Sequence, residues 1–290
     1  MCDELTTDDN ARLLAADDVS RRRFGVLAGA AGLTALLPAP ADAQTVRGRD
    51  VTIATPDGRC DGYFVAPATG RHPGVLVWPD IMGLRPGFRR MADRLAQSGY
   101  AVLTVNQFYR SRKAPVLAPG EAFEQPAVRD RLMGWRKPLT PAATASDARA
   151  FIAWLDRQKA VDTRRGLAST GYCMGGPMTM RAAAERPDRV RAGASFHGGG
   201  LATDAPDSPH LLVPRMKAQY LFAIAENDDQ RDPAAKDRLR TAFAAARLAA
   251  EIEVYPGTMH GWCPPDSPVY NAAQADRAWQ RMLALFGRAL

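Results

Sequence analysis

The chain has 290 residues, of which 46% are hydrophobic and 24% are charged, and its formal net charge is +7. This composition is typical of an ordinary globular protein that can bury a substantial core. Its lysines and arginines are scattered rather than gathered into a basic run with aromatic residues, so the charge argues against nucleic-acid binding and implies only a mild attraction for anionic substrates.

The first 43 residues differ from the rest of the chain. Ser-Arg-Arg-Arg-Phe at 20–24 precedes an apolar, Ala/Gly-rich run at 25–37, and Ala-Asp-Ala follows at 41–43. This order predicts a cleaved export signal of the twin-arginine type, because the apolar run is too short to span a membrane. The alternative is an amphipathic N-terminal helix. The signal predicts a periplasmic protein whose partners include the export machinery, with no membrane span in the mature chain.

Residues 44–290 are predicted to form one α/β domain. Strands are expected at 51–54, 62–66, 74–78, 101–105, 165–170, 190–196, 219–225 and 251–255, and helices at 86–98, 142–158, 178–184, 233–249 and 271–290. Strands that alternate with helices predict a mostly parallel sheet with helices on both faces. Residues 107–140 are rich in Arg and Pro with weak periodicity, which indicates a lid-like surface excursion.

A nucleophile elbow is indicated by Gly-Tyr-Cys-Met-Gly-Gly at 171–176. Glycines on either side of Cys173, between a predicted strand and a predicted helix, favour a tight turn that lifts the side chain clear of the sheet. The helix N-terminus would favour the nucleophilic thiolate. The alternative is a helix-capping turn with a buried, inert cysteine.

The cysteine count is compatible with a reactive thiol. The four cysteines are Cys2, Cys60, Cys173 and Cys263, and none forms a CxxC pair. Cleavage of the signal would remove Cys2 and leave an odd number, so at least one thiol stays unpaired within the chain and Cys173 is the candidate. A disulfide between Cys60 and Cys263 remains open.

An acid and a base follow the elbow in the order that α/β hydrolases use. Asp228 and Asp229 come just after the strand 219–225, and His260 follows the strand that ends at 255. The carboxyl ends of such strands are where open α/β sheets place their sites. Asp228 is the preferred acid because it lies three residues past the strand, and Asp229 is the close alternative.

The remaining histidines have simpler interpretations. His72 and His210 lie in predicted loops. His197 directly follows the strand 190–196 and reaches the same edge, so it is either a hydrogen-bonded structural histidine or a contact for the substrate.

An oxyanion hole is expected from two backbone N–H groups. One belongs to Met174, which follows the nucleophile, and the other to Ile81 in the loop after the strand 74–78. Asp80 in that loop is either a turn residue or an auxiliary base near the thiol.

Several segments resemble the dienelactone hydrolase family of α/β hydrolases. The likeness covers the chain from about residue 50 to its end, and it is carried by Asp-Ile-Met-Gly at 80–83, residues 91–95 with Gly-Tyr at 99–100, the elbow at 171–176, His-Gly-Trp at 260–262 and the tail at 270–279. The resemblance implies a triad of Cys173, His260 and Asp228. It also implies hydrolysis of an ester or lactone through an acyl-thioester, of the carboxymethylenebutenolidase type, without metal or cofactor.

Two positions depart from that family's pattern. The best-known members carry a Glu, which helps to activate the thiol, where this chain has the shorter Asp80. They also hold a substrate carboxylate with arginines, one of which stands where this chain has Pro264. Arg110 or Arg112 is expected to replace such a contact, and Trp262 is a further candidate for the substrate.

Two other classes of function stay open at this point. The chain could be a non-catalytic binding protein with the same fold, or a thiol redox protein that uses Cys173 and Cys263. A metal site is the least supported, because no His/Cys pair has ligand-like spacing. The sequence predicts neither the individual substrate nor the oligomeric state.

Overall fold

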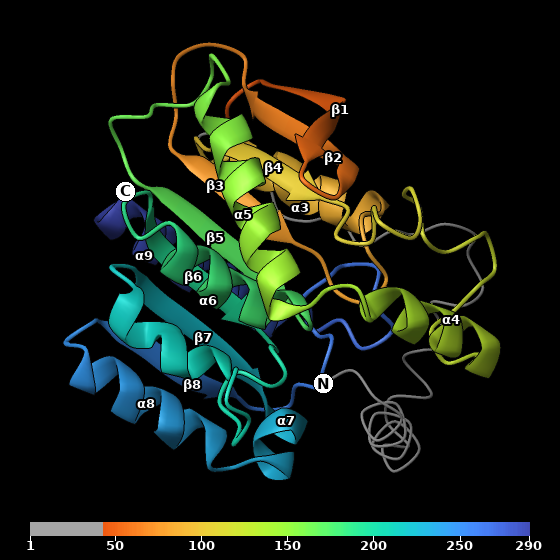
Figure 1. The fold of residues 1–290 in the computed structure, drawn as a ribbon, viewed down its shortest axis with the longest axis vertical. Coiled ribbons are helices and arrows are strands. Elements are labelled where there is room, and N and C mark those ends of the chain that lie inside the picture. The colour runs from red at the N-terminus through yellow and green to blue at the C-terminus, as the bar shows by residue number, and fades with distance from the viewer. Residues whose placement is uncertain (1–42) are drawn as a thin grey trace.

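The computed structural model describes residues 43–290, and the predicted export signal therefore lies outside the described residues apart from its last position. Eight strands form one sheet in the order β1-β2-β4-β3-β5-β6-β7-β8 (Figure 1). They are β1 (Val46–Thr55), β2 (Gly58–Pro67), β3 (Gly74–Trp78), β4 (Ala101–Val105), β5 (Leu167–Tyr172), β6 (Val190–Phe196), β7 (Gln219–Ala225) and β8 (Ala250–Tyr255). Six of them are mutually parallel, which confirms the predicted α/β class.

The first two strands form an antiparallel hairpin. β1 pairs with β2 in antiparallel register from Val46 opposite Pro67 to Thr55 opposite Gly58. β2 then pairs antiparallel with β4, so the hairpin extends one edge of the parallel sheet. The sharp turn is possible because Gly58 adopts a positive φ of 140°, which favours glycine.

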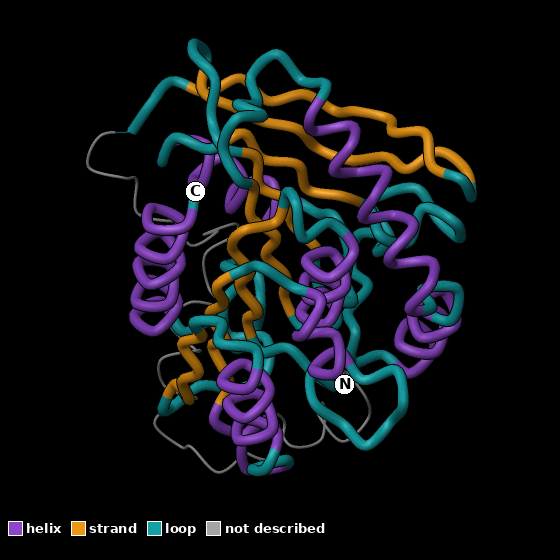
Figure 2. Tube along the Cα trace, turned by 60° about the vertical axis from the view of Figure 1, so that its left-hand side comes forward, coloured by secondary structure: helices purple, strands orange, loops and turns teal. Residues whose placement is uncertain are grey.

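Helices cover both faces of the sheet (Figure 2). They are α3 (Pro86–Gln97), α4 (Pro126–Arg136), α5 (Pro141–Asp156), α6 (Gly175–Glu185), α7 (Glu226–Arg231), α8 (Ala235–Ala245) and α9 (Ala272–Ala289), with a short 3-10 helix η1 (Pro209–Arg215). Figure 1 looks onto the face that α5, α6 and α8 cover. No helix among the described residues is long and apolar enough to cross a membrane.

Alternation along the buried strands divides the core in two. Along β3, Leu76 and Trp78 face the cluster that contains Phe151 of α5. Val75 and Val77 face the opposite cluster, which includes residues of α3 and α9. Because successive side chains of a strand point to opposite faces, a fully apolar strand supplies both clusters at once.

The excursion at 107–140 contains a helix that the sequence pattern did not predict. α4 buries only Val128 and Leu132 among its 11 residues, and the rest of it is largely polar or exposed. Two buried positions are too few to establish a helical period. Both side chains pack into the cluster that α5 and α6 cover, and the partly buried Met133 and Trp135 pack against the same cluster.

Candidate active site

The elbow at Cys173 has a constrained backbone. β5 ends at Tyr172, Cys173 adopts a φ of 55°, and α6 begins at Gly175. A left-handed conformation costs a residue with a β-carbon free energy, so the surroundings must hold it in place. The Cys173 N–H donates to the carbonyl of Phe196 at 3.0 Å, and the Gly176 N–H donates to the carbonyl of Cys173 at 3.0 Å.

The glycines of the elbow are required by close packing. A β-carbon at Gly171 would lie 2.1 Å from the Gly175 carbonyl oxygen, and one at Gly175 would lie 2.3 Å from the Trp78 carbonyl oxygen. The second distance also shows that the start of α6 lies directly against the end of β3. The loop after β3 and the elbow are therefore neighbours, as an oxyanion hole built from both would require.

The structure brings together His260 and Asp228. The Nδ1 atom of His260 lies 2.8 Å from Oδ2 and 3.0 Å from Oδ1 of Asp228. Asp229 instead forms an ion pair with Lys236, with 2.5 Å between Nζ and Oδ1. Asn227, which the sequence did not single out, accepts the His260 backbone N–H at 2.8 Å and fixes the loop that carries the imidazole.

His197 lies beside His260 at the carboxyl edge of the sheet. The two ring centroids are 5.0 Å apart at an interplanar angle of 70°. His197 is 1% exposed and adopts a positive φ of 40°. Neither of its ring nitrogens has a hydrogen-bond partner among the described residues. Burial lowers the pKa of His197 well below its ordinary value, and His260 and Arg85 lower it further.

The loop after β3 is held by an arginine that the sequence did not indicate. Arg85 donates from Nη1 and Nη2 to the two carboxylate oxygens of Asp80, at 2.6 and 3.0 Å. It also donates from Nε and Nη2 to Asp266, at 3.1 and 3.0 Å. Asp80 further accepts the Met82 N–H at 2.9 Å. The Asp80 carboxylate therefore orders its own loop, and Arg85 joins that loop to Asp266 in the loop after His260.

The two expected oxyanion donors lie at the junction of that loop and the elbow. Ile81 is 4% exposed and Met174 is 7% exposed. Neither backbone N–H donates to another backbone group within the described part of the chain. Both belong to the apolar cluster that contains Cys173.

Two expected substrate contacts are corrected by the structure. Arg110 donates from Nη1 and Nη2 to the carboxylate of Asp147 at 2.7 and 2.8 Å, and from Nε and Nη2 to Asp57. Arg110 joins residues 107–140 to α5 and to the β1–β2 hairpin. Its guanidinium therefore has a structural role and is not directed at a substrate. Arg112 is exposed on the same segment.

Trp262 is the second correction, because its side chain is fully buried at 0% exposure. It stacks on Tyr255 with 4.9 Å between ring centroids, in the cluster that includes residues of α9. Neighbouring His260 belongs to the site, whereas Trp262 turns back into the core.

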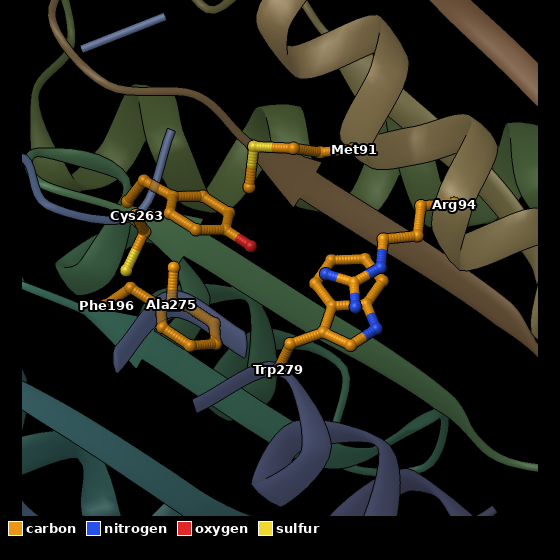
Figure 3. A pocket seen from close by; sticks show the side chains of 7 residues that line it. Met91, Arg94, Phe196, Cys263, Ala275 and Trp279 are labelled. Carbon is orange, nitrogen blue, oxygen red and sulfur yellow. The ribbon is translucent and has the colours of Figure 1, made fainter. Parts of the chain in front are cut away.

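The disulfide that the sequence left open is not present. Cys60 and Cys263 are both free and buried. They belong to clusters on opposite faces of the sheet, so the sheet separates them. Cys263 lines a pocket of about 10 Å³ with Met91, Tyr172 and Trp279, which has room for about one water molecule (Figure 3).

No cluster of three or more His, Cys, Asp or Glu side chains within residues 43–290 is arranged to hold a metal ion.

Comparisons with known proteins agree on one family. A model of the dienelactone hydrolase family matches residues 60–290. A Methylorubrum extorquens protein provisionally named a carboxymethylenebutenolidase is 29% identical over 287 residues, which cover 95% of each chain. The carboxymethylenebutenolidase of Rhodococcus opacus is 27% identical over 77% of this chain and 83% of that one. A crystal structure from Klebsiella pneumoniae, provisionally titled a dienelactone hydrolase, matches with a TM-score of 0.72 and 26% identity over 84% of this chain and all of that one.

Proposed function

Because the chain belongs to the dienelactone hydrolase family, we propose that it cleaves an ester or lactone through an acyl-enzyme on Cys173. Membership of the family makes the protein a hydrolase that acts on lactones or esters. The observation that carries the proposed mechanism is the 2.8 Å contact between His260 Nδ1 and Asp228 at the edge where the elbow presents Cys173. An oriented base beside an activated thiol is what nucleophilic catalysis requires.

The first half of the reaction forms a thioester. When the Nδ1–H of His260 donates a hydrogen bond to Asp228, Nε2 is the basic nitrogen of the imidazole. Nε2 then takes the proton of the reduced Cys173 thiol. The thiolate sulfur attacks the substrate carbonyl carbon. The carbon–oxygen bond to the leaving alkoxide then breaks, and His260 returns its proton to that oxygen.

The second half releases the acid. His260 takes a proton from water, and the hydroxide attacks the thioester carbonyl. The carbon–sulfur bond breaks and His260 returns its proton to the leaving sulfur, so the products are the carboxylic acid and the regenerated Cys173 thiol. In both halves the N–H groups of Ile81 and Met174 are proposed to stabilise the negative charge on the carbonyl oxygen; this assignment is supported by the absence of another backbone acceptor for either group among the described residues.

Asp80 has a positioning role in this mechanism. Its carboxylate is 5% exposed and accepts hydrogen bonds from Arg85 and from the Met82 N–H. These interactions set the course of the loop that presents the Ile81 amide. Residues 107–140 are proposed to cover the site from the side of this loop, because a β-carbon at Gly83 would lie 3.1 Å from Val116 Cγ2.

The test is steady-state hydrolysis of a para-nitrophenyl ester and an enol lactone by the reduced protein. We expect turnover of at least one of them and a fall in kcat/KM of about a thousandfold or more in His260→Ala, because removal of the base leaves only binding and the oxyanion hole. Equal rates in the wild type and in His260→Ala would contradict the proposal.

Export to the periplasm is a separate proposal that rests on the sequence of residues 1–43. In the native host, the mature chain is expected in the periplasmic fraction with a new N-terminus near residue 44. Replacement of Arg21 and Arg22 by lysine should retain the uncleaved chain in the cytosol. Processing that is unaffected by the double replacement would rule out the twin-arginine route.

A further inference from the structure

We propose that this site selects uncharged, apolar acyl groups or lactones and discriminates against substrates that carry a carboxylate near the scissile bond. The inference rests on the proposed function and adds the substrate class to it. Three observations carry it: the hydrogen bonds of Arg85, the balance of charges around the two imidazoles, and the apolar surroundings of the nucleophile.

Arg85 has no donor to spare for a substrate carboxylate. Its Nε and one Nη2 proton serve Asp266, the other Nη2 proton and Nη1 serve Asp80, and Nη1 also reaches the Gly83 carbonyl at 3.3 Å. A guanidinium has five N–H groups, and these contacts account for all of them. Although burial opposes its charge, Asp80 and Asp266 raise the pKa of Arg85 above its ordinary value. A substrate carboxylate would have to displace one of two buried partners.

The charged side chains that contact His260 or Arg85 are mainly carboxylates. Asp228 contacts His260 at 2.8 Å. Arg85 is close enough to His197 to affect its pKa, and it brings two carboxylates with it. Three carboxylates, those of Asp80, Asp266 and Asp228, therefore accompany one guanidinium at this edge. A second anion placed among them is repelled, and the low-dielectric surroundings strengthen that repulsion.

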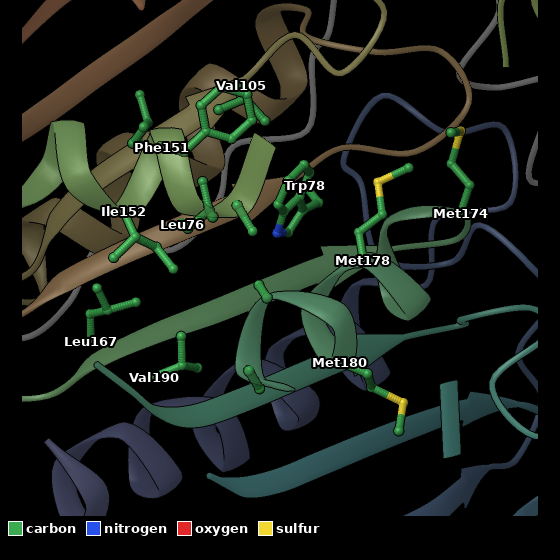
Figure 4. Packing of buried hydrophobic residues seen from close by; sticks show 14 of the residues in the cluster. Leu76, Trp78, Val105, Phe151, Ile152, Leu167, Met174, Met178, Met180 and Val190 are labelled. Atoms are coloured by element: carbon green, nitrogen blue, oxygen red, sulfur yellow. The ribbon is translucent and has the colours of Figure 1, made fainter. Parts of the chain in front are cut away.

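The acyl side of the nucleophile is apolar. Cys173 belongs to the buried apolar cluster on this face; Met174 follows it directly in the chain, and Met178 lies in the first turn of α6. Met174 and Met178 lie on the same side of the sheet as Trp78 (Figure 4). Thioether and aliphatic surfaces accept hydrocarbon chains of varied shape, whereas an unpaired carboxylate there would lose its hydration without compensation.

The two arginines that the sequence offered as substrate contacts do not offset this balance. Arg112 is exposed, so its charge is screened by water and salt. Arg110, on the same segment, is held by Asp147 and Asp57.

The test uses two esters of matched length. Para-nitrophenyl hexanoate and mono-para-nitrophenyl adipate share a six-carbon acyl chain that ends in a methyl group or a carboxylate, and the methyl ester of the adipate controls for polarity without charge. We expect kcat/KM for hexanoate to exceed that for adipate by about tenfold or more, with the methyl ester closer to hexanoate. An adipate value equal to or above the hexanoate value would overturn the inference.

A matched pair of variants locates the cause. Asp266→Asn removes one carboxylate and weakens one side of the Arg85 clamp, so the ratio of adipate to hexanoate kcat/KM should rise several-fold. Asp57→Asn makes the same change at Arg110 and should leave the ratio as in the wild type. A ratio that does not move in Asp266→Asn, or that moves equally in both variants, contradicts the assignment to the Arg85 cluster.

Alkylation of reduced Cys173 gives a readout that needs no turnover. Iodoacetamide and iodoacetate have nearly the same size and differ in charge. Their rate ratio at Cys173, divided by the ratio for a small free thiol, should favour the neutral reagent by about tenfold. A normalised ratio near one would overturn the charge selectivity but would leave the proposed function untouched. Absence of ester turnover together with the expected alkylation ratio would overturn the proposed function and leave the charge selectivity standing.

Discussion

Cys173 and Cys263 are both almost fully buried, at 2% and 6% exposure, yet they occupy different kinds of position. Cys173 lies in a left-handed turn between the end of β5 and the start of α6. Cys263 packs among aromatic side chains on the other face, where burial raises the pKa of its thiol. Exposure does not separate these two cysteines. Their backbone conformation and their distance from a helix N-terminus do.

The same contrast holds for the carboxyl edge of the sheet as a whole. Two of the three non-glycine residues with positive φ within 43–290 are Cys173 and His197, which follow neighbouring strands. Strain and buried polar groups are costly, and they persist where function requires them. Residues at this edge and matched residues elsewhere should therefore respond differently to the same replacement.

The largest difference is expected between the two cysteines. Cys173→Ala should lower kcat/KM for a para-nitrophenyl ester by about ten-thousandfold, because the acyl-enzyme cannot form. Cys263→Ala should keep kcat/KM within about twofold and lose roughly 1 kcal/mol of unfolding free energy from the small cavity. Comparable activity of the two variants would erase the distinction.

The two neighbouring aspartates should differ by a smaller factor. Asp228→Asn removes the acceptor that orients the imidazole of His260, and kcat should fall by about a hundredfold to ten-thousandfold. Asp229→Asn breaks only the ion pair with Lys236, and kcat should change by less than about threefold. Steady-state kinetics on one ester measures both. A larger loss in Asp229→Asn would reassign the acid.

Two glycine-to-alanine replacements compare packing at the edge and away from it. A β-carbon at Gly175 would lie 2.3 Å from the Trp78 carbonyl oxygen, so Gly175→Ala should lower the unfolding free energy by about 2–3 kcal/mol. Gly287 in α9 has nothing within 4 Å, and Gly287→Ala should raise it by roughly 0.5 kcal/mol. Urea denaturation reports both values. A stable Gly175→Ala variant would contradict the close approach of β3 and α6.

The smallest effect concerns pH and His197. Its pKa is lowered in the folded state, so below about pH 6.5 the unfolded chain binds a proton that the folded chain does not. Stability should therefore fall with decreasing pH, by up to about 1.4 kcal/mol per pH unit from this group. His197→Phe should remove that part of the slope in urea titrations between about pH 6 and 4. An unchanged slope would mean that another group carries it.

Much of the fold could be predicted from the sequence. The strands at 74–78, 101–105, 190–196 and 219–225 are observed with the predicted bounds, because strands buried on both faces read as continuous apolar runs with clear ends. α4 could not be predicted because only two of its residues, Val128 and Leu132, are buried.

The site could be predicted only in part. The elbow, Asp228 and His260 each follow a strand, so local patterns place them at one edge. Arg85 could not be found in this way, since its partner Asp266 lies 181 residues away in sequence. Trp262 was misassigned because proximity to His260 in sequence does not say which way a side chain turns, and this one packs on Tyr255.

The most direct test of the central claim is the mass of the protein during turnover. The reduced chain is mixed with para-nitrophenyl hexanoate, quenched with acid before the steady state, and digested. We predict a burst of about one para-nitrophenol per chain and a hexanoyl group on the peptide that contains Cys173, released by hydroxylamine. Ester turnover with no acyl group on that peptide, or with the group on another residue, would contradict the account.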